Sequence, residues 1–299
     1  MKQEFLHETK THGMLTFPYT AYNGNLPEYL PSVPLHWHDE MEFIYVTGGG
    51  GVVTVSSAAY DVKPGDILVV LPQMVHSIER YPEQQLEYFN ILFRFSLLNA
   101  SENDVCYEKY FKPLYDHTKS VPVYLGAGTE LNGQIRPYIS YLTETKEGRD
   151  VEDELMVKSS LFAVISCLNR RSFPVSNSEL TLQNTYDKLK KVLLYIQEHY
   201  ETDISVSAAA DMCGFSSSYF MKLFKELTGK SFSQYLKNYR LEMAARQLAD
   251  GGEKVIRIAA DTGFRNLSYF TRAFTDKYGV TPSVYRKRFT PCSPNRHSL

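Results

Sequence analysis

Long apolar runs are missing from this 299-residue sequence. The longest apolar stretches are short, such as residues 161–168, which Ser166 interrupts. A helix that crosses a bilayer needs about 20 consecutive apolar residues. Residues 1–10 are polar and charged, so they do not resemble a secretory signal. We therefore expect a protein that has no membrane partner and is located in the cytoplasm.

Cysteine is scarce and scattered. The four cysteines are Cys106, Cys167, Cys213 and Cys292, and none has a neighbour at the short spacing of a cysteine metal site. A disulfide-stapled secreted domain is also excluded, because such domains are small and rich in paired cysteines. We expect reduced thiols in a cytoplasmic protein.

The chain has no large excess of one charge, yet its charge is unevenly distributed. The net charge at pH 7 is −2. Residues 183–299 carry 18 Lys and Arg against 11 Asp and Glu, a net of +7, whereas residues 1–182 carry 14 against 23, a net of −9. A basic C-terminal part suits a polyanionic partner, and an acidic N-terminal part would be kept away from phosphate.

One stretch of the basic part occurs twice. The first copy comprises residues 210–215, 219–224 and Gly229, and the second comprises residues 259–264, 269–274 and Gly279. The offset is 49 residues at the start and 50 after the Gly-Phe pair, so the second copy has one extra residue. A repeat of this period indicates one supersecondary unit used twice.

Each copy predicts a helix, a tight turn and a second helix. Gly214 and Gly263 stand where the first helix must end. Candidate N-caps of the second helix follow: Ser216, Ser217 and Ser218, or Asn266 and Ser268. The second helices place apolar residues on one face: Phe220, Leu223, Phe224 and Leu227, or Phe270, Ala273 and Phe274. The opposite faces carry hydrogen-bonding and cationic residues, as in a DNA-binding helix-turn-helix.

A long helix is predicted over residues 231–250, between the two copies. It would be roughly 27–30 Å long, which could place two recognition helices about one DNA turn, ~34 Å, apart. The alternative is a helical repeat that binds protein, an adaptor without salt-dependent affinity for DNA. Two copies with cationic outer faces favour nucleic acid.

These motifs closely resemble the DNA-binding domain of the AraC/XylS family of transcription regulators. The resemblance covers residues 185–289 and includes residues 229–236 and 279–286, although residues 207–210 are small where the family is usually rich in leucine. It implies promoter DNA as the ligand, RNA polymerase as a partner and, more commonly, activation. Carried onto this sequence, the DNA-binding residues are Ser217, Ser218, Met221, Lys222, Lys225, Asn266, Ser268, Thr271 and Arg272. Base contacts are expected from Met221, Lys222, Asn266, Thr271 and Arg272, and phosphate contacts from Ser218, Lys225 and Ser268.

Residues 1–100 predict a β-sandwich or small barrel. Short apolar runs at residues 41–47, 52–55, 67–71 and 88–95 are separated by turn residues such as Pro64-Gly65-Asp66. The segment from His36 to Glu42, together with Pro64-Gly65-Asp66 and His76, resembles the two motifs of the cupin barrel, which many AraC-type regulators carry as an effector domain. The sequence departs from that pattern at Gln73 and Arg80 and lacks a glycine before the first histidine.

The cupin resemblance implies an effector site at His36, His38, Glu42 and His76, where metal-binding cupins have their ligands. In the regulators these positions commonly line a pocket without metal, so we expect no metal and no cofactor. The effector is a small molecule, and the abundant Tyr and Phe residues would suit a sugar-like or aromatic one. A metal-dependent cupin enzyme remains the alternative. The sequence names neither the effector nor the operator.

Residues 101–171 are predicted to be mainly helical, with helices at 130–148 and 151–171. By the family resemblance this helical pair forms a homodimer; the alternative is that it only covers the barrel. The expected organisation is an effector-binding and dimerisation domain at 1–171, a linker at 172–182, a DNA-binding domain at 183–289 and a tail at 290–299. The fold class is α+β multidomain, with a cupin-like N-terminal part and an all-α C-terminal part containing two helix-turn-helix motifs.

Overall fold

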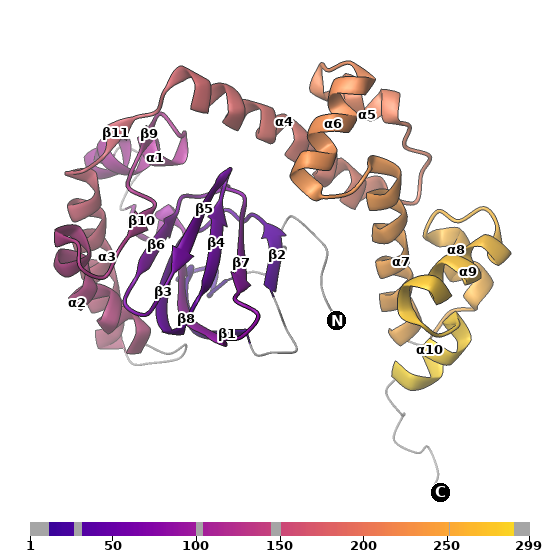
Figure 1. Ribbon diagram of the computed structural model, residues 1–299, viewed down its shortest axis with the longest axis horizontal. Helices are drawn as coiled ribbons and strands as arrows, with labels where there is room; N and C mark the ends of the chain where they lie inside the picture. The colour runs from indigo at the N-terminus through magenta and orange to yellow at the C-terminus, as the bar shows by residue number, and fades with distance from the viewer. Residues whose placement is uncertain (1–11, 27–31, 100–103, 145–150, 251, 290–299) are drawn as a thin grey trace, which may run out of the picture. The chain divides into compact units, whose positions relative to one another are not determined.

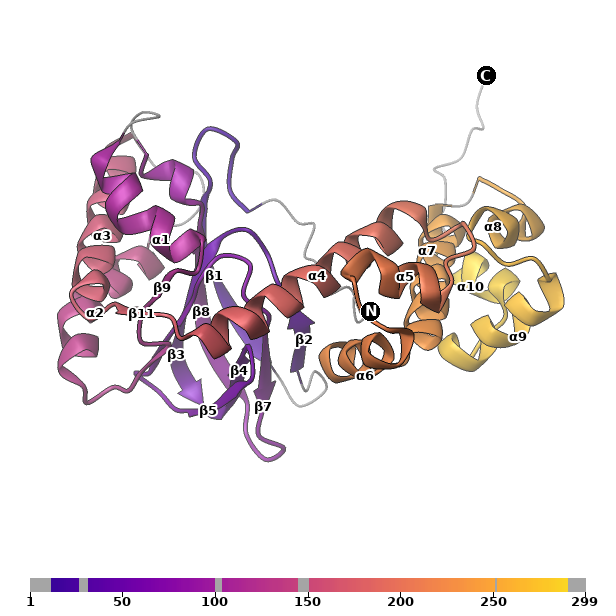
Figure 2. The ribbon, with the colours of Figure 1, turned by 90° about the horizontal axis from the view of Figure 1, so that it is seen from above.

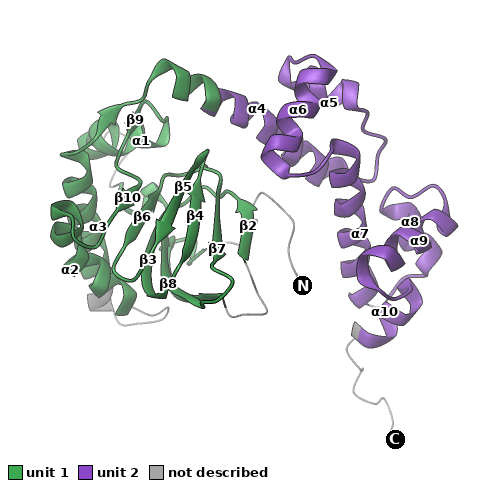
Figure 3. Ribbon diagram, in the orientation of Figure 1, with its two compact units in different colours: residues 1–182 green, residues 183–299 purple. Residues whose placement is uncertain are grey.

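The computed structural model describes residues 12–26, 32–99, 104–144, 151–250 and 252–289. It consists of two compact units, residues 1–182 and 183–299 (Figure 3). The expected tail and the end of the helix predicted over 130–148 lie outside the described residues. Three cysteines, Cys106, Cys167 and Cys213, are free thiols.

The two larger antiparallel sheets of the N-terminal unit are arranged as a cupin-like barrel (Figure 1). The five-stranded sheet has the order β1 (Tyr19–Leu26), β8 (Leu86–Phe93), β3 (Met41–Gly49), β6 (Ile67–Val70) and β10 (Tyr124–Leu125). The four-stranded sheet has the order β2 (Ser32–His36), β7 (His76–Arg80), β4 (Gly51–Val55) and β5 (Ala58–Val62). The runs predicted as strands near residues 41–47, 52–55, 67–71 and 88–95 correspond to β3, β4, β6 and β8.

The central strand β3 is buried on both faces. Met41 and Phe43 belong to the core between the five-stranded sheet and the helices. Ile44 and Val46 belong to the core inside the barrel. Because side chains alternate along a strand, Glu42 shares the interior face with Ile44 and Val46.

Helices cover the outer face of the five-stranded sheet. The helices α2 (Glu130–Glu144) and α3 (Val151–Asn169) lie side by side there (Figure 2). Before them come the short elements η1 (Phe95–Leu97), η2 (Tyr107–Phe111), α1 (Lys112–Tyr115) and β9 (Lys119–Ser120). Leu161 and Ile165 of α3 are buried in this core, whereas Leu155 is 74% exposed.

The segment 172–182, expected as a linker, is partly regular. Phe173–Pro174 form β11, which pairs with β9. Helix α4 (Asn177–His199) then begins six residues before the boundary between the units. Its start carries a capping box, in which Ser176 N donates to Glu179 Oε2 at 2.9 Å and Glu179 N donates to Ser176 Oγ at 3.3 Å.

The C-terminal unit is all helical and contains the two predicted helix-turn-helix motifs. The first motif is α5 (Val206–Cys213) with α6 (Ser217–Thr228), and the second is α8 (Val255–Asp261) with α9 (Leu267–Tyr278). Helix α7 (Phe232–Asp250) connects them, and α10 (Pro282–Phe289) follows. The helix predicted over residues 231–250 is therefore confirmed as α7.

Local chemistry fixes the two turns. Gly214 ends α5 with a φ of +66°, in the left-handed region that suits glycine. Gly263 also has a positive φ, and a Cβ at this position would lie 2.9 Å from the Glu201 carbonyl oxygen. Ser216 caps α6 and Asn266 caps α9, each accepting from a backbone N–H three residues later.

Aromatic side chains hold each motif together. In the first motif Phe220 and Phe224 pack against Phe232 of α7, with ring centroids 5.6 and 5.4 Å away. In the second, Phe274 packs against Tyr285 of α10 at 5.3 Å. Lys190 of α4 is only 6% exposed although it is a lysine, and its Nζ lies 2.8 Å from Asp187 Oδ1.

Candidate functional site

The outer face of α6 is polar and accessible. Ser218, Lys222 and Lys225 are exposed, Ser217 is half-buried, and Met221 is 46% exposed. They are presented outward because Phe220, Phe224 and Leu227 bind the opposite face to the core. Lys222 Nζ also lies 3.9 Å from Glu226 Oε1, a weak pair because both side chains are well exposed.

The outer face of α9 is the second polar surface. Ser268 and Arg272 are exposed, and Thr271 is half-buried. Arg272 lies on the face opposite to Phe270 and Phe274, which are fully buried. The structure therefore presents a guanidinium from α9 and two ammonium groups from α6, the side chains that pair with guanine edges and phosphates.

Asn266, which the sequence offers both as an N-cap candidate and as a DNA contact, is the N-cap of α9. Its Oδ1 accepts from Tyr269 N at 2.9 Å and caps α9. Its side-chain amide group can still donate, so capping and DNA contact are compatible.

Sequence reasoning missed two exposed tyrosines at equivalent positions of the repeat. Tyr219 is 49% exposed and Tyr269 45%. Each packs on the phenylalanine of its turn, with ring centroids 5.2 Å apart for Phe215 and Tyr219 and 6.2 Å apart for Phe264 and Tyr269. Their position before the first buried phenylalanine of each second helix was a usable signal, since it recurs in both copies.

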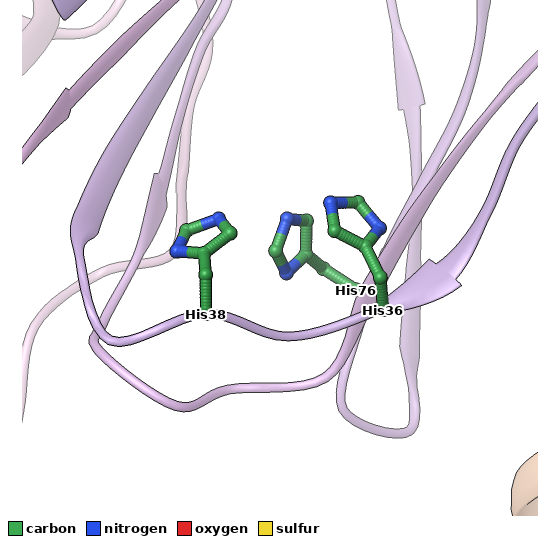
Figure 4. Close-up of side chains that lie close together, drawn as sticks. All are labelled: His36, His38 and His76. Carbon is green, nitrogen blue, oxygen red and sulfur yellow. The ribbon is translucent and has the colours of Figure 1, made fainter. Parts of the chain in front are cut away.

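In the N-terminal unit the four predicted effector residues converge. His36 ends β2, His38 lies in the following loop, Glu42 lies on β3 and His76 begins β7. The ring centroids of His36 and His76 are 4.1 Å apart, and those of His38 and His76 are 5.0 Å apart. Figure 4 shows the three rings side by side, projecting to the same side of their backbone segments. His38, Glu42 and His76 are at most 2% exposed.

The carboxylate of Glu42 joins two of the rings. Its Oε2 lies 3.1 Å from His38 Nε2 and 2.8 Å from His76 Nε2. The His76 contact is close, but the ring does not aim an N–H bond at the oxygen. Ligand atoms of His36, His38 and His76 all lie within 4.8 Å of one another, so this cluster has the composition and size of a metal-binding group.

Burial controls the charges in this cluster. It lowers the pKa of His36 to about 3, helped by the neighbouring His76, so this ring is neutral near pH 7. Burial alone would raise the pKa of Glu42, but His76 and His38 outweigh it and hold that pKa well below its usual value. The carboxylate is therefore ionised although it is fully buried.

Further polar rings border the cluster, and sequence analysis did not single them out. The ring centroid of His12 lies 6.1 Å from that of His38 and 6.2 Å from that of Tyr22. Asn90 Nδ2 donates to the Tyr22 hydroxyl at 3.5 Å. These residues come from β1, β8 and the segment before β1, so only the folded sheet brings them to the histidines.

A barrel with a buried polar cluster and a separate unit with two helix-turn-helix motifs define a ligand-binding, DNA-binding regulator. A family model described as an AraC-like ligand binding domain matches residues 28–183, and one described as a helix-turn-helix domain matches residues 209–288. The chain belongs to the AraC family of transcription regulators, which are not enzymes. It is thus a DNA-binding transcription regulator with a ligand-binding domain.

Curated relatives match over most of their length. The chain is 22% identical over 290 residues to the HTH-type transcriptional regulator YdeC of Bacillus subtilis, covering 94% of this chain and 96% of that one. It is 26% identical to the HTH-type transcriptional activator RhaS of Mannheimia succiniciproducens, covering 85% and 89%. It is 27% identical to an activator RhaR of Pectobacterium carotovorum, covering 87% and 88%.

Solved structures include similar chains. The DNA-binding domain of AdpA, in complex with a target DNA, is 27% identical over 34% of this chain and 92% of that one, with a TM-score of 0.33. ToxT of Vibrio cholerae, with a bound unsaturated fatty acid, is 13% identical over 93% and 97%, with a TM-score of 0.39. Within the described part of the chain, no helix combines the length and apolar character that a membrane span requires.

Proposed function

We propose that this regulator binds a small-molecule effector through His36, His38, Glu42 and His76 and thereby changes its binding to promoter DNA. The observation that carries the proposal is the convergence of these four side chains, from three strands and a loop, inside the barrel. Burying an ionised carboxylate and three imidazoles costs stability, and a ligand-binding role accounts for keeping them there.

The effector fits best as a small polar molecule with hydroxyl groups, such as a sugar. Imidazoles and a carboxylate are good hydrogen-bond partners for hydroxyls, and Tyr22 and Asn90 add further polar groups nearby. Aromatic rings beside these groups suit the apolar face of a sugar ring.

In the proposed DNA complex, α6 and α9 enter the major groove. Met221, Lys222, Asn266, Thr271 and Arg272 contact bases, and Ser218, Lys225 and Ser268 contact phosphates. Ser217 is a further DNA-binding residue at the start of α6. The outward positions of Lys222, Lys225 and Arg272 support this arrangement.

The regulator acts as a cytoplasmic homodimer that activates transcription with RNA polymerase. Activation is supported by the names of the RhaS and RhaR relatives. The dimer surface is the exposed apolar part of α3: Leu155 is 74% exposed, Met156 49% and Phe162 39%. A second copy of the chain is the proposed occupant, because a twofold-symmetric dimer brings the same patch of both copies together and would cover these apolar side chains.

One experiment tests the central proposal. Genomic fragments are selected on the full-length protein with and without a panel of sugars, other polyols and aromatic acids. An effector is identified when it changes which fragments are retained or how tightly they bind. Specific fragments that no metabolite influences would argue against the effector role and leave DNA binding intact.

A further inference from the structure

Helix α7 carries one helix-turn-helix motif on each of its halves (Figure 1). On the first half, Phe232 and Tyr235 pack against Phe224 of α6, and the ring centroids are 5.4 Å apart in both pairs. On the second half, Leu241 belongs to the same buried core as Phe270 of α9. Apolar burial is not directional, so it does not by itself fix how the second motif is rotated relative to the first.

Arg240 lies on α7 between these two halves and is half-buried. Its Nε donates to the Tyr200 carbonyl oxygen and its Nη2 to the Thr202 carbonyl oxygen, each at 2.7 Å. These carbonyls directly follow α4, where a helix leaves its last carbonyl groups without partners of its own. The same loop leads into α5 of the first motif. Because a guanidinium is planar and donates in a fixed fork, the contact sets a direction as well as a distance.

The turn of the second motif closes on the same guanidinium. A Cβ on Gly263 would lie 2.8 Å from Arg240 Nε and 2.9 Å from the Glu201 carbonyl oxygen. An ion pair at 3.2 Å between Arg265 and Asp203 joins the same turn to the same loop, but both side chains are well exposed, so the pair is weak. Burial lowers the pKa of Arg240, since its charge is partly withdrawn from water. Its hydrogen bonds are therefore the less screened of these contacts.

We propose that Arg240 is a positioning residue that holds the second helix-turn-helix motif at a fixed rotation relative to the first, and thereby sets which spacing of two DNA half-sites the regulator accepts. Three segments meet at this side chain: α7, the loop between α4 and α5, and the turn between α8 and α9. The length of α7 separates the motifs, and Arg240 fixes their relative rotation. This role rests on the proposed contacts of α6 and α9 with DNA bases.

The geometry of DNA makes such a rotation matter. Moving the second half-site by one base pair displaces it by ~3.4 Å and turns it by ~35° about the duplex axis. Two motifs held rigidly cannot follow that turn without losing contacts. Without the guanidinium the second motif can rotate to meet a displaced half-site. Binding at the native spacing then weakens, because the motifs must be ordered when they bind.

The test uses full-length protein and a duplex library of random sequence. Wild-type protein selects duplexes from the library, and the two blocks of specified bases are read from them. The tightest duplex is then rebuilt with its second block moved by one base pair in either direction. We expect the wild type to bind each displaced duplex at least about tenfold more weakly than the native spacing. Arg240→Ala should bind the native spacing more weakly than the wild type does, yet lose less than about threefold on displacement.

Arg246→Ala is the matched control, because it removes the same charge from an exposed position of α7. It should discriminate between the spacings as strictly as the wild type. Arg240→Lys keeps the charge but not the fork of donors. It should discriminate less than the wild type, and it replaces Arg240→Ala if circular dichroism shows that the alanine variant is unfolded.

Equal discrimination by the wild type and the folded Arg240 variant would overturn the positioning role and leave the proposed DNA contacts standing. A wild type that binds displaced and native duplexes equally would also overturn it. Wild-type protein that selects only one block of bases would overturn the positioning role together with the proposed base contacts of one recognition helix.

Discussion

At the scale of single residues, we expect Arg272 to contact DNA bases and Lys225 to contact phosphate, so their variants should differ. Both are exposed on the outer faces of the second helices. A guanidinium can form two hydrogen bonds with guanine, worth about 1–3 kcal/mol of discrimination, whereas a lysine at phosphate carries no sequence information. We expect Arg272→Ala to weaken operator binding and to change binding to a scrambled duplex little. Lys225→Ala should weaken both equally. Titrations of both duplexes at several salt concentrations measure the difference.

Arg171→Ala is the control for loss of a positive charge, because Arg171 lies in the N-terminal unit and pairs with Glu130 at 3.1 Å. It should bind both duplexes as the wild type does. Equal losses on operator and scrambled duplex for Arg272→Ala would show that Arg272 contacts phosphate only.

The second prediction uses two substitutions of Asn266 to distinguish its role as a helix cap from its role as a DNA contact. Asn266→Ala should lower the free energy of unfolding of the C-terminal unit by about 1 kcal/mol, because α9 loses its cap. Asn266→Ser should restore stability, since serine also caps, but it removes the amide that could donate to a base. Denaturant unfolding and operator titration of both variants measure the two roles. If serine restores operator affinity as well as stability, Asn266 acts as a cap alone.

Some features of single residues could be predicted from the sequence, and others could not. The caps Ser216 and Asn266 could be predicted because capping depends on residues three positions apart. The positions of His36, Glu42 and His76 could be predicted only through resemblance, since β2, β3 and β7 meet through the barrel fold. The burial of Lys190 could not be predicted, because it depends on packing of α4 against the rest of its unit.

At the scale of elements, α3 has two apolar faces with different roles. Leu161 is fully buried against the sheet, and Leu155 is 74% exposed. We expect Leu161→Asp to unfold the N-terminal unit, because an unpaired charge in the core costs several kcal/mol. Leu155→Asp should keep the fold and convert dimers to monomers. Circular dichroism and sedimentation of the full chain at micromolar concentration check both outcomes.

Lys158→Ala offers a control on the same helix that changes a charge without adding one to the apolar surface. A Leu155→Asp variant that stays dimeric would show that this face of α3 is not part of the dimer interface. The helical pattern alone could not tell the two faces apart, since leucines lie on both, Leu161 on one and Leu155 on the other, and only packing against the sheet decides which is covered.

The start of helix α4 was also predicted incompletely from the sequence. Pro174 and the turn-forming residues 176–178 suggested a linker. Ser176 and Glu179, however, have the spacing of a capping box, and their reciprocal hydrogen bonds begin the helix. The local signal for a helix was therefore present in the sequence. It was outweighed by the turn-forming residues around it.

At the scale of the whole molecule, the division of charge predicts strong salt dependence. Residues 183–299 carry a net charge of +7 and residues 1–182 a net charge of −9. The logarithm of the operator association constant should fall linearly with the logarithm of salt concentration, by about 0.9 for each phosphate neutralised. Lys225→Ala should reduce this slope by about one unit. A slope near zero would contradict phosphate binding by α6 and α9.

The last prediction concerns the separation of sensing from DNA binding between the two units. The histidine cluster lies in residues 1–182, and the DNA-contacting helices lie in residues 183–299. His76→Ala should therefore abolish the change in operator affinity that the selected effector causes, and affinity without effector should stay within about twofold of wild type, less than 1 kcal/mol. Arg272→Ala should have the opposite result: operator affinity falls, and the effector still changes that affinity by the same factor as in the wild type. Titrations with operator DNA give four affinities, one for each variant with effector and one without. If His76→Ala retains the full response, the effector binds elsewhere in the barrel, because an affinity change by a ligand requires a differential contact between ligand and protein.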